Sequence, residues 1–234
     1  MSLTIRCALA VLLGAAACQT RAADVLISTF GPADSYNGDA AFSIQHFPPD
    51  AGNPAGYLLA HAVRFTAGPT ASILDTTRLA IFRRFNSGGL PLITIAADAG
   101  GAPGAALAAK TIPGFVPVDT PFQTETAPPV DVPWHAEQVL LQAGQHYWLS
   151  LHYGAPSGQE IYWYLSQPVA QGASAARGHG YGDPAAWQVF PASSLPAFSV
   201  SSVPVPEPAA AALAIAAVAA IGARRRSWRR PATI

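Results

Sequence analysis

Cysteine is nearly absent from this chain of 234 residues. Its two cysteines, Cys7 and Cys18, both lie near the N-terminus, so the long central part of the chain can form no disulfide bond. The stability of that part must therefore come from a hydrophobic core, and about 180 residues are enough to bury one as a single domain.

Charged residues are also few, at 11% of the chain, and the formal net charge of zero hides an uneven distribution. Of the thirteen Lys and Arg residues, two lie near the N-terminus and five near the C-terminus, which leaves six in the central part. Twelve of the thirteen Asp and Glu residues lie in that same part, so it carries a net charge of about −6. This negative charge excludes binding of nucleic acid through a general positive field of the central part. It suits an extracellular protein or one that binds cations.

Motifs for the common catalytic chemistries are missing. The sequence has no Gly-x-Ser-x-Gly, no His-Glu-x-x-His and no Gly-rich phosphate loop that follows a strand and opens a helix. A Ser-His-Asp triad could still assemble in space, because its members need not be close in sequence, but no residue points to one. We therefore expect no enzymatic activity and no cofactor.

Two sets of residues are candidates for metal ligands. Asp98 in Asp98-Ala-Gly-Gly-Ala-Pro-Gly104 could open a calcium loop, but one carboxylate is too few, so we expect a turn that Asp98 caps and glycines shape. His146 and His152 could share a strand face, but six residues separate them by about 20 Å, too far for one metal. We expect no metal site and isolated surface or edge histidines: His46, His61, His135, His146, His152 and His179.

The N-terminal segment, residues 1–23, has the pattern of a secretory signal peptide. Arg6 precedes an apolar stretch, Cys7–Cys18, and small residues follow, with cleavage expected near Ala22 or Ala23. Lipoprotein processing at Cys18 is the alternative, although Ala15 stands where a lipobox usually has leucine.

The C-terminal segment, residues 204–234, combines a short polar motif, an apolar run and a basic cluster. The apolar run Ala209–Ala223 would form a helix of about 22 Å, which is short for a membrane span and needs the flanking residues at the interfaces. A buried or amphipathic helix and a basic tail for nucleic acid are alternatives, but the run has no polar face. The cluster that follows fits a stop-transfer signal held in the cytoplasm: Arg224, Arg225, Arg226, Arg229 and Arg230.

This arrangement resembles the PEP-CTERM sorting signal of Gram-negative bacteria, with Pro206, Glu207 and Pro208 as its motif. In that family a membrane protease/transpeptidase, exosortase, recognises the segment. The resemblance implies export, transient anchoring in the inner membrane, processing near the motif, and delivery to the cell surface or extracellular matrix.

The central part, residues 24–203, predicts an all-β domain, an antiparallel β-sandwich with jelly-roll or immunoglobulin-like connectivity. Short runs that alternate with period 2 are bounded by Gly and Pro, and no amphipathic helix is evident. In Arg78–Phe85, Leu79 and Ile81 should face away from Ala80 and Phe82. In His146–Tyr153, four residues should face away from Trp148, Ser150 and His152: Tyr147, Leu149, Leu151 and Tyr153. Other expected strands are 25–30, 57–66, 92–97, 106–112, 137–141, 160–165, 187–190 and 197–203; expected loops are 48–56 and 113–133, and a linker should begin near Ser201.

Several short segments of this domain resemble the choice-of-anchor R family of bacterial surface domains, which end in interchangeable anchoring signals. They are Ile27–Tyr36, Asp98–Gly104, His146–Leu151 and Pro196–Ser201. The family brings no catalytic residues to this chain.

Aromatic residues are the candidate ligand-binding groups. Tyr162 and Tyr164 should face opposite to Trp163. These three residues and Trp148 are the candidates for an aromatic platform that binds flat sugar faces. Packing in the core is the alternative, because aromatic residues mostly bury. We therefore expect an exported, non-enzymatic surface or matrix protein, structural within a biofilm or exopolysaccharide layer. The alternative is a secreted carbohydrate-binding module or a glycan-active enzyme.

Overall fold

The computed structural model describes residues 22–50, 56–83, 90–112, 128–153, 159–178 and 185–205. The predicted signal peptide, the motif 206–208, the apolar run 209–223 and the arginines of 224–230 lie outside the described residues and stay predictions. Within the described ranges, no helix is long and apolar enough to cross a membrane.

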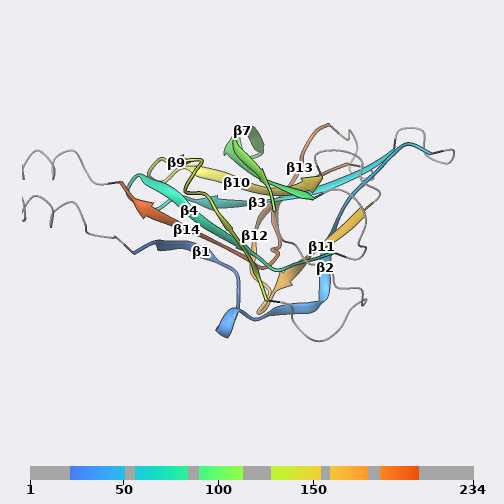
Figure 1. The fold of residues 1–234 in the computed structure, drawn as a ribbon, viewed down its shortest axis with the longest axis horizontal. Helices are drawn as coiled ribbons and strands as arrows, with labels where there is room; N and C mark the ends of the chain where they lie inside the picture. The colour runs from blue at the N-terminus through green and yellow to red at the C-terminus, as the bar shows by residue number, and fades with distance from the viewer. Residues whose placement is uncertain are drawn as a thin grey trace, which may run out of the picture.

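The described chain is all-β and forms two antiparallel sheets (Figure 1). The smaller sheet has β14 between β1 and β4, and the far edge of β4 carries β8 at one end and β9 at the other. Its strands are β1 (Asp24–Ser28), β4 (Ser72–Leu79), β8 (Val130–Pro133), β9 (Leu140–Leu141) and β14 (Phe198–Pro204).

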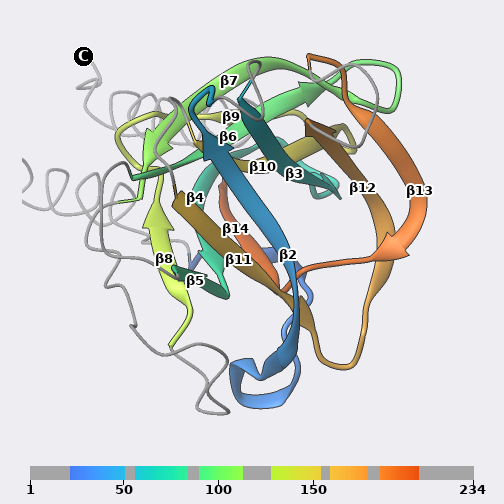
Figure 2. The ribbon, with the colours of Figure 1, turned by 90° about the vertical axis from the view of Figure 1, so that its right-hand side faces the viewer.

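The larger sheet has nine strands and curls into a half-barrel (Figure 2). Its path runs β5-β11-β2-β3-β10-β6-β7, and β12 joins it beside β3, with β13 beyond. The strands are β2 (Tyr36–Phe47), β3 (Tyr57–Thr66), β5 (Ile81–Arg83), β6 (Pro91–Asp98), β7 (Pro103–Thr111), β10 (His146–Tyr153), β11 (Gln159–Ser166), β12 (Gln171–Gly178) and β13 (Gln188–Ser194). A single 3-10 turn, η1 (Pro32–Asp34), precedes β2.

The main core draws side chains from both sheets. Leu74, Val132 and Phe198 of the smaller sheet belong to the same buried cluster as Val63 and Leu149 of the larger one. Because side chains alternate along a strand, the other face of β10 and β11 points away from this core. The predicted alternation in β10 is confirmed, since Tyr147, Leu149, Leu151 and Tyr153 lie in the main core and Trp148 does not.

The chain passes from one sheet to the other at Ala80. We expected one strand over Arg78–Phe85, and this was wrong, because β4 ends at Leu79 and β5 begins at Ile81 in the other sheet. The Ala80 N–H donates to the Ala197 carbonyl at 3.1 Å, and the Ala80 carbonyl accepts from Tyr164 at 2.9 Å. Its backbone therefore bonds to Tyr164 of β11 in the larger sheet and to Ala197, the residue before β14 of the smaller sheet. The predicted facing of Leu79 and Ile81 against Ala80 and Phe82 is confirmed.

Several expected boundaries were also wrong. The expected loop 113–133 ends in a strand, Val130–Pro133, and the expected linker from Ser201 is strand as far as Pro204. Only Leu140–Leu141 of the expected strand 137–141 pairs, because Gln138 has a positive φ of 48° that a strand cannot continue. Two further strands were missed altogether, β2 and β12.

Candidate functional surfaces

Trp163 packs in the main core, between the two sheets. Its side chain is fully buried, and its ring meets the edge of Phe198 with centroids 6.2 Å apart. The indole Nε1–H donates to the Ala197 carbonyl at 3.1 Å. A residue held in this way offers no surface to a sugar.

Trp148 is equally buried, but on the opposite face of the larger sheet. It packs among small side chains of neighbouring strands, including Ala62, Ala96 and Ala175, and Trp187 packs against the same cluster. Its Nε1–H donates to Asp98 Oδ1 at 2.6 Å. Trp148 is therefore a packing residue whose only polar atom is satisfied inside the protein.

Tyr162 and Tyr164 belong to a separate group on the outer side of β11, which we call the outer aromatic cluster. Tyr164 stacks on Tyr36 with ring centroids 5.2 Å apart, and Tyr162 stacks on Phe82 at 6.2 Å. Tyr36, Phe82 and Tyr164 are buried by one another, whereas Tyr162 is half-buried. The predicted opposition of these tyrosines to Trp163 is confirmed.

Burial keeps the phenols of this cluster neutral. It raises the pKa of Tyr36 to about 12, with a further contribution from Tyr164, and burial also raises the pKa of Tyr164. The hydroxyls therefore stay protonated at physiological pH and can act as hydrogen-bond donors.

A polar group lies beside the outer aromatic cluster. Ser43 Oγ donates to Glu160 Oε1 at 2.7 Å, and Gln45 Nε2 donates to Ser43 Oγ at 2.6 Å and to the same carboxylate. Ser43 is paired with Tyr162 and Gln45 with Glu160, so these side chains share one face of β2 and β11. Sequence reasoning missed this group, although Glu160 stands two residues before Tyr162 and therefore faces the same way.

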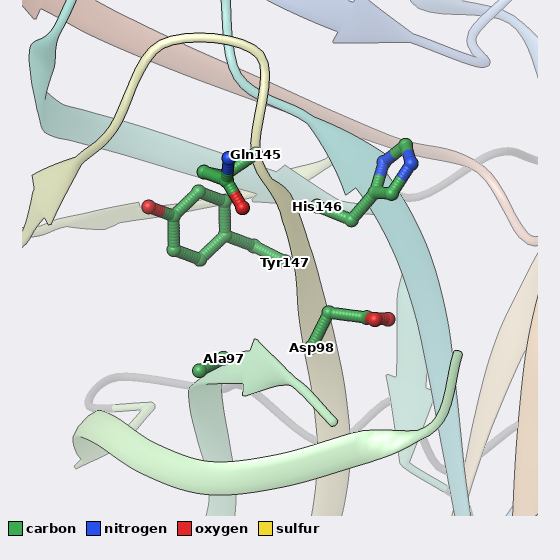
Figure 3. A pocket seen from close by; sticks show the side chains of 5 residues that line it. All are labelled: Ala97, Asp98, Gln145, His146 and Tyr147. Carbon is green, nitrogen blue, oxygen red and sulfur yellow. The ribbon is translucent and has the colours of Figure 1, made fainter. Parts of the chain in front are cut away.

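The expected turn at Asp98 is confirmed. Asp98 Oδ2 accepts from the Gly101 N–H at 2.8 Å, and Gly100 and Gly101 have φ of 68° and 91°. A shallow cavity of about 170 Å³ opens beside the turn, and Figure 3 shows its five lining residues: Ala97, Asp98, Gln145, His146 and Tyr147. Both carboxylate oxygens of Asp98 are already bonded, one to the Gly101 N–H and one to the Trp148 indole, so Asp98 has a structural role here.

The histidines are not all surface residues. The expectation was wrong for His61, which is 6% exposed and stacks on Phe42 with ring centroids 4.5 Å apart. Burial lowers the pKa of His61 to about 4, so it stays neutral. Over the described ranges, no group of three or more His, Cys, Asp or Glu side chains is placed to hold a metal ion.

Comparison with known proteins gives no assignment. No protein-family model matches this chain, and no curated protein matches it either.

Proposed function

We propose that this chain is an exported, non-enzymatic surface or matrix protein whose β domain has a structural role. A signal peptide at residues 1–23 would take it across the inner membrane, and exosortase would process it at Pro206–Pro208. The apolar run 209–223 and the arginines of 224–230 would anchor it until that step. The two sheets then form the body of a sandwich of the kind found in choice-of-anchor surface domains.

The observation that carries this proposal is the position of the motif directly after the last strand. Strand β14 ends at Pro204, and the Val205 N–H donates to the Ala71 carbonyl at 2.9 Å. Pro206, Glu207 and Pro208 follow at once in the sequence. A processing enzyme at the membrane would therefore find its motif just outside the folded domain. The burial of Trp148 and Trp163 also supports a structural role for the domain.

Substitution of Glu207 tests the proposal in a Gram-negative host that carries an exosortase. We expect Glu207→Ala to leave a membrane-bound precursor, because the acidic group of the motif is what the enzyme reads. The matched control is Glu160→Gln within the folded domain, which should be processed like the wild type. Equal processing of Glu207→Ala and the wild type would contradict the proposal.

A second candidate function is carbohydrate binding at the outer aromatic cluster. Tyr162 is its half-buried member, and Ser43, Gln45 and Glu160 supply hydrogen-bonding groups on the same face. Aromatic faces beside carboxylate and amide groups suit the apolar and hydroxyl faces of a sugar ring. Glycan-array binding that Tyr162→Ala abolishes would support this function, and an array without signal for the wild type would exclude it.

A further inference from the structure

Two basic side chains, Arg177 and His152, lie on the outer face of the larger sheet, the face that holds Trp148, and a third, His46, lies near them. Arg177 of β12 is paired with Ala60 of β3. His152 of β10 lies opposite Ala60 on the other side of β3, because the preceding residue of β10, Leu151, is paired with His61. Arg177 and His152 therefore flank the short Ala60 side chain, with Cα atoms about 10 Å apart, two strand spacings.

His46 of β2 completes this group, which we call the basic cluster. It is paired with Leu58, two residues before Ala60 along β3. Its charge lowers the pKa of His152, which places the two imidazoles within electrostatic reach. Three different neighbours of β3 thus each bring one basic group to the same place.

Gly178 allows Arg177 to reach this position. Its φ is +127°, and a Cβ there would lie 1.8 Å from the Leu58 carbonyl oxygen. The end of β12 can therefore press against β3 only with glycine at this position. The Arg177 side chain also packs over Trp187, with its guanidinium carbon 4.7 Å from the centre of the indole ring.

The basic cluster has no anionic partner within the described ranges. No carboxylate there lies within ion-pair distance of Arg177, and neither Arg177 Nε nor His46 Nδ1, both buried, has a hydrogen-bond partner. His152 is bonded through Thr94 Oγ1 at 3.2 Å and the Tyr153 carbonyl at 3.3 Å. A partly buried guanidinium is costly unless a counter-charge lies beside it, and a bound anion would supply one.

We propose that the basic cluster of Arg177, His152 and His46 binds an oxyanion, the sulfate, phosphate or sugar-carboxylate group of a ligand. The planar guanidinium presents a fork of N–H donors that matches two oxygens of such a group. Both ring nitrogens of His152 are already bonded, so its protonation adds positive charge beside the site rather than a free donor. The Nδ1 atom of His46 has no partner and is the imidazole nitrogen that could bond the anion. This site stands apart from the outer aromatic cluster and does not depend on the sorting proposal.

Protonation should couple to binding at this site. Burial lowers the pKa of His152 below its ordinary 6.5, the Tyr153 carbonyl opposes this, and the charges of Arg177 and His46 lower the pKa further. The other neighbours that face it, Thr94 and Ala60, do not titrate. An anion bound among these groups would raise the pKa of His152 again, so binding takes up a proton. The affinity for the anion therefore rises as the pH falls through the pKa of His152 in the free protein.

Isothermal titration calorimetry of the purified full-length protein with sulfate and with galacturonate tests the proposal. Both probes keep their charge between about pH 5.5 and about pH 7.5, so any pH dependence belongs to the protein. We expect saturable binding of at least one probe, several-fold tighter at the lower pH. Binding of both probes indicates a site for small free oxyanions, and binding of galacturonate alone indicates a site for acidic sugars. Galactose, which lacks the carboxylate, should not bind.

Arg177→Gln should weaken binding by about tenfold or more, and His152→Gln should remove most of the pH dependence. Arg64→Gln is the matched control, because Arg64 also lies over a tryptophan of this face, 6.0 Å from the Trp148 ring centre. It should bind like the wild type. Absence of saturable binding to either probe, or equal binding by Arg177→Gln and Arg64→Gln, would overturn the proposal.

Discussion

The indole N–H of Trp148 donates to Asp98 across 2.6 Å, between residues fifty positions apart in the chain. The same carboxylate caps the turn that joins β6 to β7 through the Gly101 N–H. One acidic side chain therefore satisfies a buried tryptophan and shapes a turn, so Asp98 should be a major contributor to stability.

Asp98→Ala should lower the free energy of unfolding by about 2–3 kcal/mol, because it leaves the buried Trp148 N–H and a turn N–H without acceptors. Urea denaturation measures the change. Asp131→Ala is the control, since Asp131 is half exposed and pairs with Arg78 in an ion pair open to water. That variant should cost about 1 kcal/mol or less. Equal losses for the two variants would show that Asp98 has no special structural role.

Two aromatic residues of β11 that lie on opposite faces, Trp163 and Tyr162, should differ in how much stability their truncation costs. Trp163→Ala removes a fully buried side chain from the main core and should cost about 3–5 kcal/mol of unfolding free energy. Tyr162→Ala removes a half-buried ring from the outer side and should cost about 1 kcal/mol. Thermal melts of both variants check this. A larger loss for Tyr162→Ala would contradict the assignment of the two faces.

The stability of the folded protein should decrease as the pH falls, because His61 takes up a proton more readily in the unfolded chain. Its pKa is about 4 in the folded protein and 6.5 as the ordinary value, so the unfolded chain binds the proton first. The loss from this group begins as the pH falls below about 6.5, reaches up to about 3 kcal/mol, and stops growing below about pH 4.

His61→Gln should remove that part of the pH dependence, as urea denaturation at several pH values would show. His146→Gln, at the exposed start of β10, is the matched control and should change the profile less than His61→Gln does. An identical slope for His61→Gln and the wild type would mean that His61 is not kept neutral by burial.

Glycine at position 178 should be irreplaceable. Gly178→Ala would place a Cβ 1.8 Å from the Leu58 carbonyl oxygen at a φ of +127°, so β12 must shift away from β3. We expect a loss of roughly 3 kcal/mol or more, or failure to fold. Gly100→Ala, at a φ of +68° with open space around it, should cost only about 1–2 kcal/mol. Thermal melts compare the two, and similar losses would contradict the close approach of β12 to β3.

Local patterns in the sequence predicted much of the fold. The strand Tyr57–Thr66 was predicted with both ends correct, because it is a largely apolar run between Gly56 and Gly68. The strand Tyr36–Phe47 was missed because Asn37-Gly38-Asp39 has the composition of a turn. Its conformation comes from pairing with β11, more than a hundred residues later, which no local pattern reveals.

The candidate sites depended even more on distant contacts. The alternation of side chains along a strand correctly placed Trp163 on the face opposite to Tyr162 and Tyr164. It could not show which of the two faces lies in the main core. Trp148 looked like a candidate for sugar binding until Asp98 and the alanines of three neighbouring strands were placed around it. The basic cluster was invisible for the same reason, because Arg177, His152 and His46 come from three separate strands.

The central claim is that the chain is exported and cut at its C-terminal motif, and intact-mass spectrometry of the exported protein tests it most directly. The account predicts a mature chain that begins near Asp24 and ends close to Pro206–Pro208, without the five arginines. An exported protein that retains its sequence through Ile234 would contradict the account.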